Sequence, residues 1–137
     1  MEKTPVRLSK LLEETNINGF NELRKQVHEK IEFDGMDLSN KALKDANLKS
    51  IILRNVNLSK TNLYNATLDN SQISGDLSNV NLTNASLSNA MLAGANLNGA
   101  DLTGAYLNDA VLTGAYFDSA YLRNTSLWNV ILTDADI

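Results

Sequence analysis

The sequence predicts an all-β solenoid, a square coil of about 5.5 turns that follows a short helical segment. An apolar residue recurs at every fifth position from Phe33 to Ile73, and after one step of four residues the series resumes at Leu77 and continues to Ile137. Leu and Asn together fill 41 of the 137 positions. So narrow a composition is typical of a repeat and leaves little room for a chemically varied active site.

A period of five matches neither the 3.6 residues of a helical turn nor the two residues of a flat strand. It fits a chain that turns one corner per repeat, so that every fifth side chain points to the axis and four repeats close one coil. The 22 repeats then give about 5.5 coils, which strand-like hydrogen bonds would stack about 4.8 Å apart. The central residues expected to fill the axis include Phe33, Leu38, Leu53, Leu92, Leu112, Phe117 and Leu132.

The residue two before each centre is expected to be small, because it packs at a crowded inner edge. It is Ala in eight consecutive repeats from Ala85 to Ala120. Lys41 is the exception, and its charge predicts a local distortion of the first coil. The four-residue step is a one-residue deletion near residues 74–76, which we expect to trim a corner without shifting the walls. The other three positions face solvent and carry short polar side chains that hydrogen-bond nearby backbone.

Units such as Ala-Asn-Leu-Asn-Gly at 95–99 and Ala-Asp-Leu-Thr-Gly at 100–104 resemble the A-(D/N)-L-x-x unit of pentapeptide repeat proteins. The resemblance covers residues 31–137 and implies a right-handed quadrilateral β-helix. The Leu-centred, Ala-rich form is most similar to the variety that is abundant in cyanobacteria. Members of the family are largely uncharacterised or assigned to interaction roles, so the resemblance implies a scaffold that binds other proteins.

Residues 1–30 lack the repeat and predict two helices. Thr4 followed by Pro5 suits a helix start, and residues 16–19 are expected to break that helix. A second apolar stripe has helical spacing and consists of Phe20, Leu23, Val27 and Ile31. Because the first coil of a solenoid has unpaired backbone, we interpret this segment as a cap. The alternative is a recruitment helix for a partner. His28, the only histidine, is expected to be a solvated cap residue.

Outward residues on one wall of the coil should recur every 20 residues, or every 19 across the deletion. One wall is then mostly apolar and consists of Glu32, Ile52, Gln72, Met91, Val111 and Ile131. Tyr106 and Trp128, the only tryptophan, are expected on the next wall. An exposed apolar patch with aromatic anchors is typical of an interaction site. The candidate interaction surface is Ile52, Met91, Tyr106, Val111, Trp128 and Ile131; the alternative is that these side chains only cover backbone.

The C-terminal end of the repeat has no predicted helix after it. The series continues to Ile137, so the last coil is expected to expose an apolar end. Either the coil tolerates this, or two molecules stack end to end, or the chain is a fragment of a longer protein. Our hypothesis is that this end makes a contact, either with a protein partner or by self-association.

Several kinds of chemistry are excluded by composition. There is no Cys and only one His, which excludes disulfides, thiolate nucleophiles, catalytic triads and His-rich metal sites. The acidic residues of the repeat are separated, so no carboxylate pair for acid/base catalysis is expected. We therefore predict no catalytic, cofactor-binding or metal-binding residues and no cofactor. A net charge of −4 argues against nucleic acid as a partner. No apolar run predicts a signal peptide or membrane contact, so the expected location is cytoplasmic.

Two functions remain open. The first is a rigid module that presents outward side chains to another protein. The second is DNA mimicry toward a type II topoisomerase, which the resemblance implies for some family members. Residues 31–137 carry 11 acidic and 6 basic side chains, a net charge of −5. Duplex DNA would carry about 15 charges over the expected length of roughly 26 Å. The charge density therefore favours the interaction module.

Overall fold

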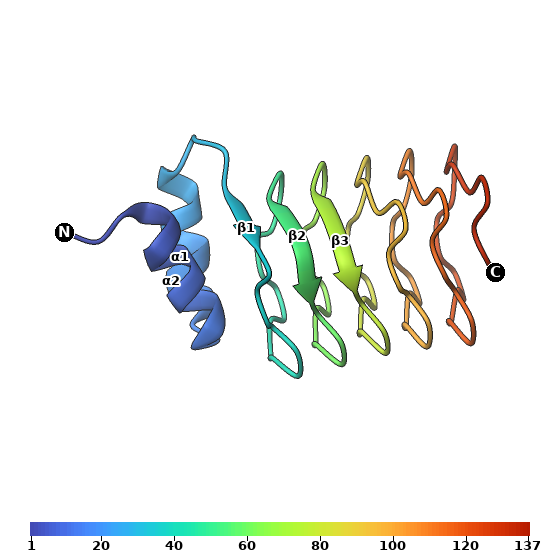
Figure 1. Ribbon diagram of the computed structural model, residues 1–137, viewed down its shortest axis with the longest axis horizontal. Coiled ribbons are helices and arrows are strands. Elements are labelled where there is room, and N and C mark those ends of the chain that lie inside the picture. The colour runs from blue at the N-terminus through green and yellow to red at the C-terminus, as the bar shows by residue number, and fades with distance from the viewer.

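The computed structural model describes all 137 residues, as two helices followed by a row of stacked coils (Figure 1). Helix α1 spans Thr4–Glu13 and α2 spans Ile17–Gln26. Strands β1 (Glu32–Asp34), β2 (Ile52–Asn57) and β3 (Gln72–Asp76) form a parallel sheet in the order β1-β2-β3. Each strand lies one coil beyond the last, and the N-terminus and C-terminus lie at opposite ends of the stack.

Successive coils are joined by parallel β-bridges that fall into four columns. Bridged residues are 20 apart where no deletion intervenes, as for Asn81 and Asp101, and 19 apart across it, as for Asn62 and Asn81. The deletion therefore leaves every column in register, as the sequence predicted. The register shift lies between β2 and β3, where Val56 pairs with Gly75.

The buried residues occupy the two inner positions of the repeat. Among the predicted axial residues the five buried ones are Leu38, Leu53, Leu92, Leu112 and Phe117. Phe33 and Leu132 are only partly buried. Both belong to the outermost coils, which have a neighbouring coil on one side only, and both pack against the buried core.

One repeat, residues 62–66, shows why the unit has its sequence. The Leu63 carbonyl accepts a hydrogen bond from the Ala66 N–H at 3.0 Å, which closes a turn. Asn65 takes a left-handed φ of 57° inside that turn, a conformation that Asn, Asp and Gly adopt most readily. Asn62 stabilises the same turn, because its Oδ1 accepts the Tyr64 N–H at 3.0 Å. We call this second bond the Asx hydrogen bond.

The helix boundaries differ from the predicted ones by a few residues. The N-cap of α1 is Lys3, with Thr4 already helical. Pro5 fits the second helical position because the N–H groups of the whole first turn lack helical partners. The break is shorter than residues 16–19, since α2 starts at Ile17 and the Asn16 side chain accepts the Gly19 N–H at 3.0 Å.

The second apolar stripe is helical only in part. α2 ends at Gln26 and the backbone of Val27 is extended, so the helical assignment of Val27 and Ile31 was wrong. Ile31 is nevertheless buried, in the first coil, together with Phe20 of α2. Val27 and Ile31 thus have helical spacing in the sequence, although the chain has already left the helix and leads into the repeat.

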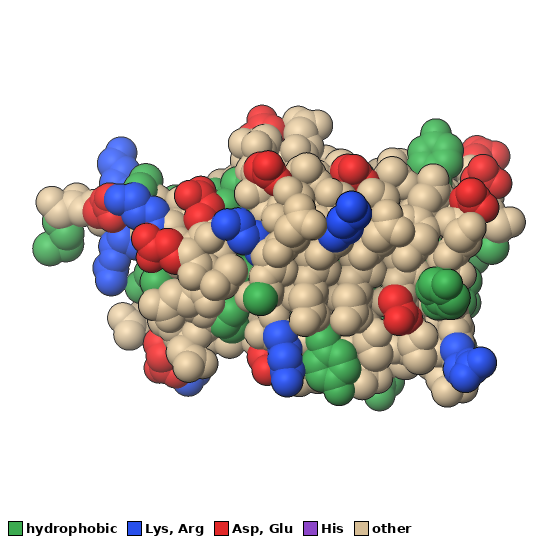
Figure 2. Space-filling view, turned by 90° about the horizontal axis from the view of Figure 1, so that it is seen from below, with side chains coloured by type: hydrophobic (Ala, Val, Ile, Leu, Met, Phe, Trp, Pro, Cys, Tyr) green, Lys and Arg blue, Asp and Glu red, His purple; other side chains and the backbone are tan.

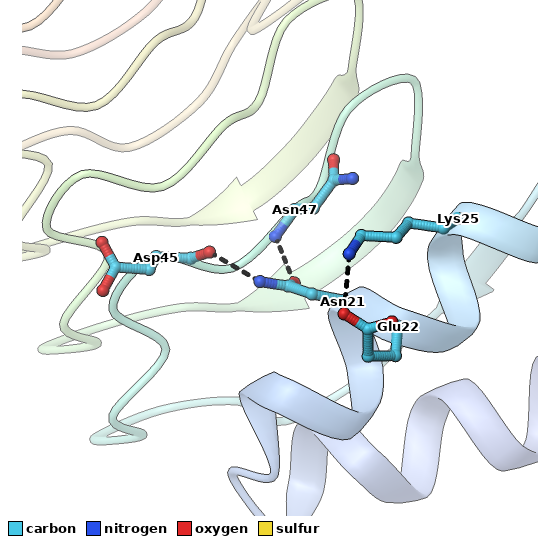
Figure 3. Close-up of polar contacts among 5 residues, drawn as sticks. All are labelled: Asn21, Glu22, Lys25, Asp45 and Asn47. Atoms are coloured by element: carbon cyan, nitrogen blue, oxygen red, sulfur yellow. Dashed lines mark hydrogen bonds and ion pairs between the residues drawn. The ribbon is translucent and has the colours of Figure 1, made fainter.

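The helices satisfy backbone groups at the edge of the first coil. The Asn21 amide donates to the Asp45 carbonyl at 3.0 Å and accepts the Asn47 N–H at 2.8 Å, as a neighbouring strand would (Figure 3). Arg24 of α2 donates to the Lys49 carbonyl. These bonds are the ones that an unpaired solenoid edge needs.

Lys41 does not distort the first coil, so that expectation was wrong. Its ammonium group donates to the Glu13 carbonyl at the end of α1 at 2.8 Å. Leu43 keeps its bond to the Asn62 carbonyl at 2.8 Å, and Ala42 keeps its bridge to Asn62. The long side chain is accommodated because no earlier coil lies against this edge, and its charge meets the negative end of the helix dipole.

Candidate apolar interaction surface

The four columns of bridges have the membership that the sequence predicted. In one of them Gln72 pairs with Met91, Met91 with Val111 and Val111 with Ile131. Met91 and Ile131 are 49% and 48% exposed, and Val111 is half-buried. We call Met91, Val111 and Ile131 the apolar column.

Ile52 belongs to the same line of bridges but not to the surface. It is only 4% exposed, so its assignment to the interaction surface was wrong. It pairs with Glu32 on one side and Gln72 on the other, and Arg54 of its own coil forms an ion pair with Glu32. Long polar side chains on both neighbouring coils thus surround it.

The apolar column lacks the Asx hydrogen bonds of the other columns. In the other three columns, a side-chain oxygen accepts the N–H of the residue that follows the central residue of the repeat in most coils. None of these columns lacks such an acceptor on two successive coils. Along the apolar column the N–H groups of Ala93, Thr113 and Thr133 have no acceptor within the chain. Met91, Val111 and Ile131 cannot supply one. Three successive hydrogen bonds are therefore replaced by exposed apolar surface.

The residues that follow the centres along the apolar column are small and uncharged. Ala93, Thr113 and Thr133 lie on the same side of the coils, and the turns that follow the first two contain Gly94 and Gly114. Nothing lies within 4 Å of a Cβ added to either glycine. At its beginning the column borders a shallow hollow lined by Ile52, Leu53, Arg54, Gln72, Ile73, Ser74, Met91 and Ala93. The surface is thus uncovered and has no charged group in its middle.

The aromatic members of the predicted surface lie on the neighbouring column. Tyr106 pairs with Ser126, and the N–H of Trp128 bonds to the Asn108 side chain at 3.2 Å. Trp128 is 71% exposed. Tyr116 and Tyr121 are also exposed but belong to the other two columns. Their outward positions followed from the repeat, but the other members of their columns are mostly polar, and for that reason they were not included in the predicted surface.

The last coil also exposes axial side chains. A small hollow is lined by Leu112, Phe117, Leu122, Leu127, Leu132 and Ile137. Leu127 and Ile137 are among the exposed large apolar residues. This is a second apolar surface, at the end of the stack rather than on its side.

Charge is distributed unevenly along the stack. Eleven of the twelve Lys and Arg residues lie at or before Lys60, and only Arg123 follows. In Figure 2 blue side chains accordingly lie mainly over the helices and first coils, and large hydrophobic side chains stand out near the C-terminal end. No group of three or more His, Asp or Glu side chains is placed to hold a metal ion. No helix has the length and apolar character to cross a membrane.

Comparison with known proteins agrees with this architecture. Eight copies of the model for pentapeptide repeats match residues 43–75, 76–109 and 110–137. The structure is similar to a pentapeptide repeat protein, Rfr23, from the cyanobacterium Cyanothece 51142, with 29% identity, 89% of this chain and 97% of that chain covered, and a TM-score of 0.54.

It is also similar in fold to alr5209 from Nostoc PCC 7120, with 24% identity, coverage of 86% and 93%, and a TM-score of 0.50. No curated protein sequence matches the chain. The repeat match covers more than half of the residues, and the parallel coils are those of a right-handed β-helix. The chain belongs to the pentapeptide repeat family.

Proposed function

We propose that this protein is a non-enzymatic, rigid module that binds a partner protein through outward side chains of its repeat. In this proposal residues 31–137 form a right-handed quadrilateral β-helix of about 5.5 coils, and residues 1–30 cap it. The cross-bonded coils hold the outward residues at fixed spacing, so a partner meets a preformed surface and little ordering free energy is spent on binding. We place its action in the cytoplasm.

The observation that carries the proposal is the apolar column. An Asn or Asp at each of its three positions would supply an Asx hydrogen bond, as it does at Asn62. A typical hydrogen bond contributes about 0.5–1.5 kcal/mol to stability. The chain instead places Met91, Val111 and Ile131 there, two of them about half exposed. Local stability does not favour that choice, whereas binding of an apolar partner surface does.

A pull-down tests the proposal. Full-length chain carrying Trp128→Ser and Ile131→Ser is compared with the natural sequence as bait, and a recovered partner is purified for a direct binding measurement. We expect the double variant to lose the partner while Tyr121→Ser, an exposed position on another column, retains it. Equal recovery by all three baits would contradict the proposal.

The apolar end of the last coil is proposed as a second contact, through which the protein self-associates. The support is the hollow of six apolar side chains and the 72% exposure of Ile137. Light scattering over a concentration series should show an increase in mass, and Leu127→Asp should reverse it. A constant monomer mass at high concentration would refute this contact.

DNA mimicry is supported here only by the acidic excess of the repeat. The net charge of −5 over residues 31–137 is about a third of that on duplex DNA of the same length. We expect the purified protein to leave gyrase supercoiling unchanged. Potent inhibition would reverse the order of the two functions.

A further inference from the structure

We infer that the apolar column is the docking site of an amphipathic α-helix of the partner protein, with Gln or Asn beside its apolar stripe and Lys or Arg at its flanks. This inference rests on the proposed function and names the class of partner. Four features support it: the size of the surface, its free N–H groups, its spacing and its charge.

The size of the surface favours a single helix over a second copy as the occupant. Three coils spaced about 4.8 Å apart extend over about 14 Å, and three extended residues make a strip about 10 Å wide. Such an area, roughly 140 Å², is a small part of the about 800 Å² per partner that a stable complex buries, so the broad face of a second copy would need contacts well outside the apolar column. A single helix is about 10 Å in diameter and covers the strip completely.

The free N–H groups indicate which side chains the bound helix carries beside its apolar stripe. Ala93, Thr113 and Thr133 present three donors along one line, next to Met91, Val111 and Ile131. An occupant that covers them without supplying acceptors would leave buried donors unpaired, which weakens binding. The occupant therefore carries acceptor side chains in a row parallel to its apolar row.

A helix provides two such rows at matching spacing. Side chains at i, i+3 or i+4, and i+7 form a stripe with a repeat of about 5.4 Å, close to the spacing of the coils. Acceptors along an extended segment would recur at about 6.7 Å, twice the rise per residue, and would miss the successive donors. A helix also pairs its own backbone, whereas the side of the apolar column offers donors but no free edge for strand addition.

Charge determines the flanks of the helix. Asp109 lies two residues before Val111, and Asp134 lies three residues after Ile131. Arg123, the only basic residue beyond Lys60, is in the coil segment of Tyr121, on another column. Asp109 already holds the Asn129 amide at 2.6 Å but has no cationic partner. Both acidic residues therefore favour Lys or Arg on the helix and disfavour Glu or Asp in its acceptor row.

The test uses the full chain and a synthetic helical peptide as probe. The peptide has Leu on one stripe, Gln on the adjacent stripe and Lys on the flanks; a scrambled peptide of equal composition is the control. We expect saturable binding by fluorescence anisotropy and amide NMR shifts centred on Ala93, Thr113 and Thr133. Binding of both peptides alike, or of neither, would overturn the inference.

The decisive variant is Val111→Asn. Asn is the ordinary residue of this repeat position, so the variant restores the Asx hydrogen bond to Thr113 and should fold at least as stably as the natural chain. We expect it to weaken peptide binding by about tenfold or more. Tyr121→Asn, which introduces Asn at the equivalent repeat position of another column, should leave binding unchanged. Equal affinities of the natural chain and Val111→Asn would refute the inference.

Two further outcomes separate this inference from the proposed function. If sedimentation shows that the natural chain is a dimer and that Val111→Asn is a monomer, the occupant is a second copy and the proposal of a helical partner is refuted. If the peptide does not bind but the Trp128 and Ile131 double variant loses a natural partner in the pull-down, the proposal of a helical partner is refuted and the proposed function as an interaction module is retained.

Discussion

Gly75 lies at the one-residue deletion, and its replacement is expected to destabilise the protein strongly. Its φ is +130°, and an added Cβ would overlap the carbonyl oxygen of Val56 and lie 2.7 Å from the Val56 nitrogen. Backbone atoms of β2 cannot move aside as a flexible side chain can. Gly75→Ala therefore combines a backbone conformation that Ala disfavours with a clash inside the β2–β3 pairing.

The expected loss can be worked out from these two terms. The conformation costs about 1–3 kcal/mol and the overpacking another about 1–3 kcal/mol, so a total of about 4 kcal/mol is a central value. With about 2.1 cal/mol/K of unfolding entropy per residue, 1 kcal/mol corresponds to roughly 3.5 °C in a chain of this length. We expect the Tm of Gly75→Ala to fall by about 14 °C.

Calorimetry on Gly75→Ala and on a matched glycine checks this reasoning. Gly94 also has a left-handed backbone, with φ +69°, but nothing lies within 4 Å of its added Cβ. Gly94→Ala should therefore show only the conformational cost of about 1 kcal/mol, or roughly 4 °C. If the Tm falls by the same amount in both variants, the close approach of Gly75 to Val56 has no energetic weight and this reasoning is refuted.

Three further predictions concern polar groups. Ser71→Ala should raise the free energy of unfolding by about 1 kcal/mol in urea denaturation, because the Ser71 hydroxyl is buried without a hydrogen-bond partner. The matched change Thr61→Ala should lower the free energy of unfolding, since the Thr61 hydroxyl donates a 2.7 Å hydrogen bond. Asn21→Ala should lower the free energy of unfolding by about 1–2 kcal/mol, because it removes two hydrogen bonds to the first coil. Asn18→Ala, at an exposed helix position, should have little effect. Equal losses in the two variants would show that the Asn21 bonds do not stabilise the first coil. Hydrogen bonds from the Ser39 hydroxyl and N–H lower the pKa of Asp37. The ionised Asp37 carboxylate therefore stabilises the fold above its ordinary pKa of about 3.9, and this stabilisation is lost as the pH falls through the lower pKa of the folded state. NMR titration of Asp37 should give a midpoint below the ordinary value, and a normal midpoint would contradict the prediction.

The repeat makes most of the fold predictable from the sequence. A central Leu every fifth residue and a small residue two before it define which side chains point inward, and the columns follow by counting. The bridges from Gln72 through Ile131 and the 19-residue spacing across the deletion agree with that count. Such predictions succeed because each coil contacts only its neighbours, so local period and overall shape carry the same information.

The predictions that failed lie where neighbours of unlike kind meet. Lys41 keeps a regular backbone because it reaches the end of α1, and the period of the repeat contains no information about a helix packed outside it. Val27 has helical spacing but an extended backbone, because the helix ends before the first coil begins.

The sequence by itself determined the period, the inward and outward positions and the membership of each column, because these depend only on how many residues separate two side chains. The tertiary structure decided which outward residues are surface. Ile52 and Ile131 occupy equivalent positions, yet Ile52 is buried among the long side chains of two adjacent coils and Ile131 is not. It also decided that the apolar column has unpaired N–H groups. Exposure and hydrogen-bond satisfaction depend on atoms from several coils at once, which a count along the chain does not place.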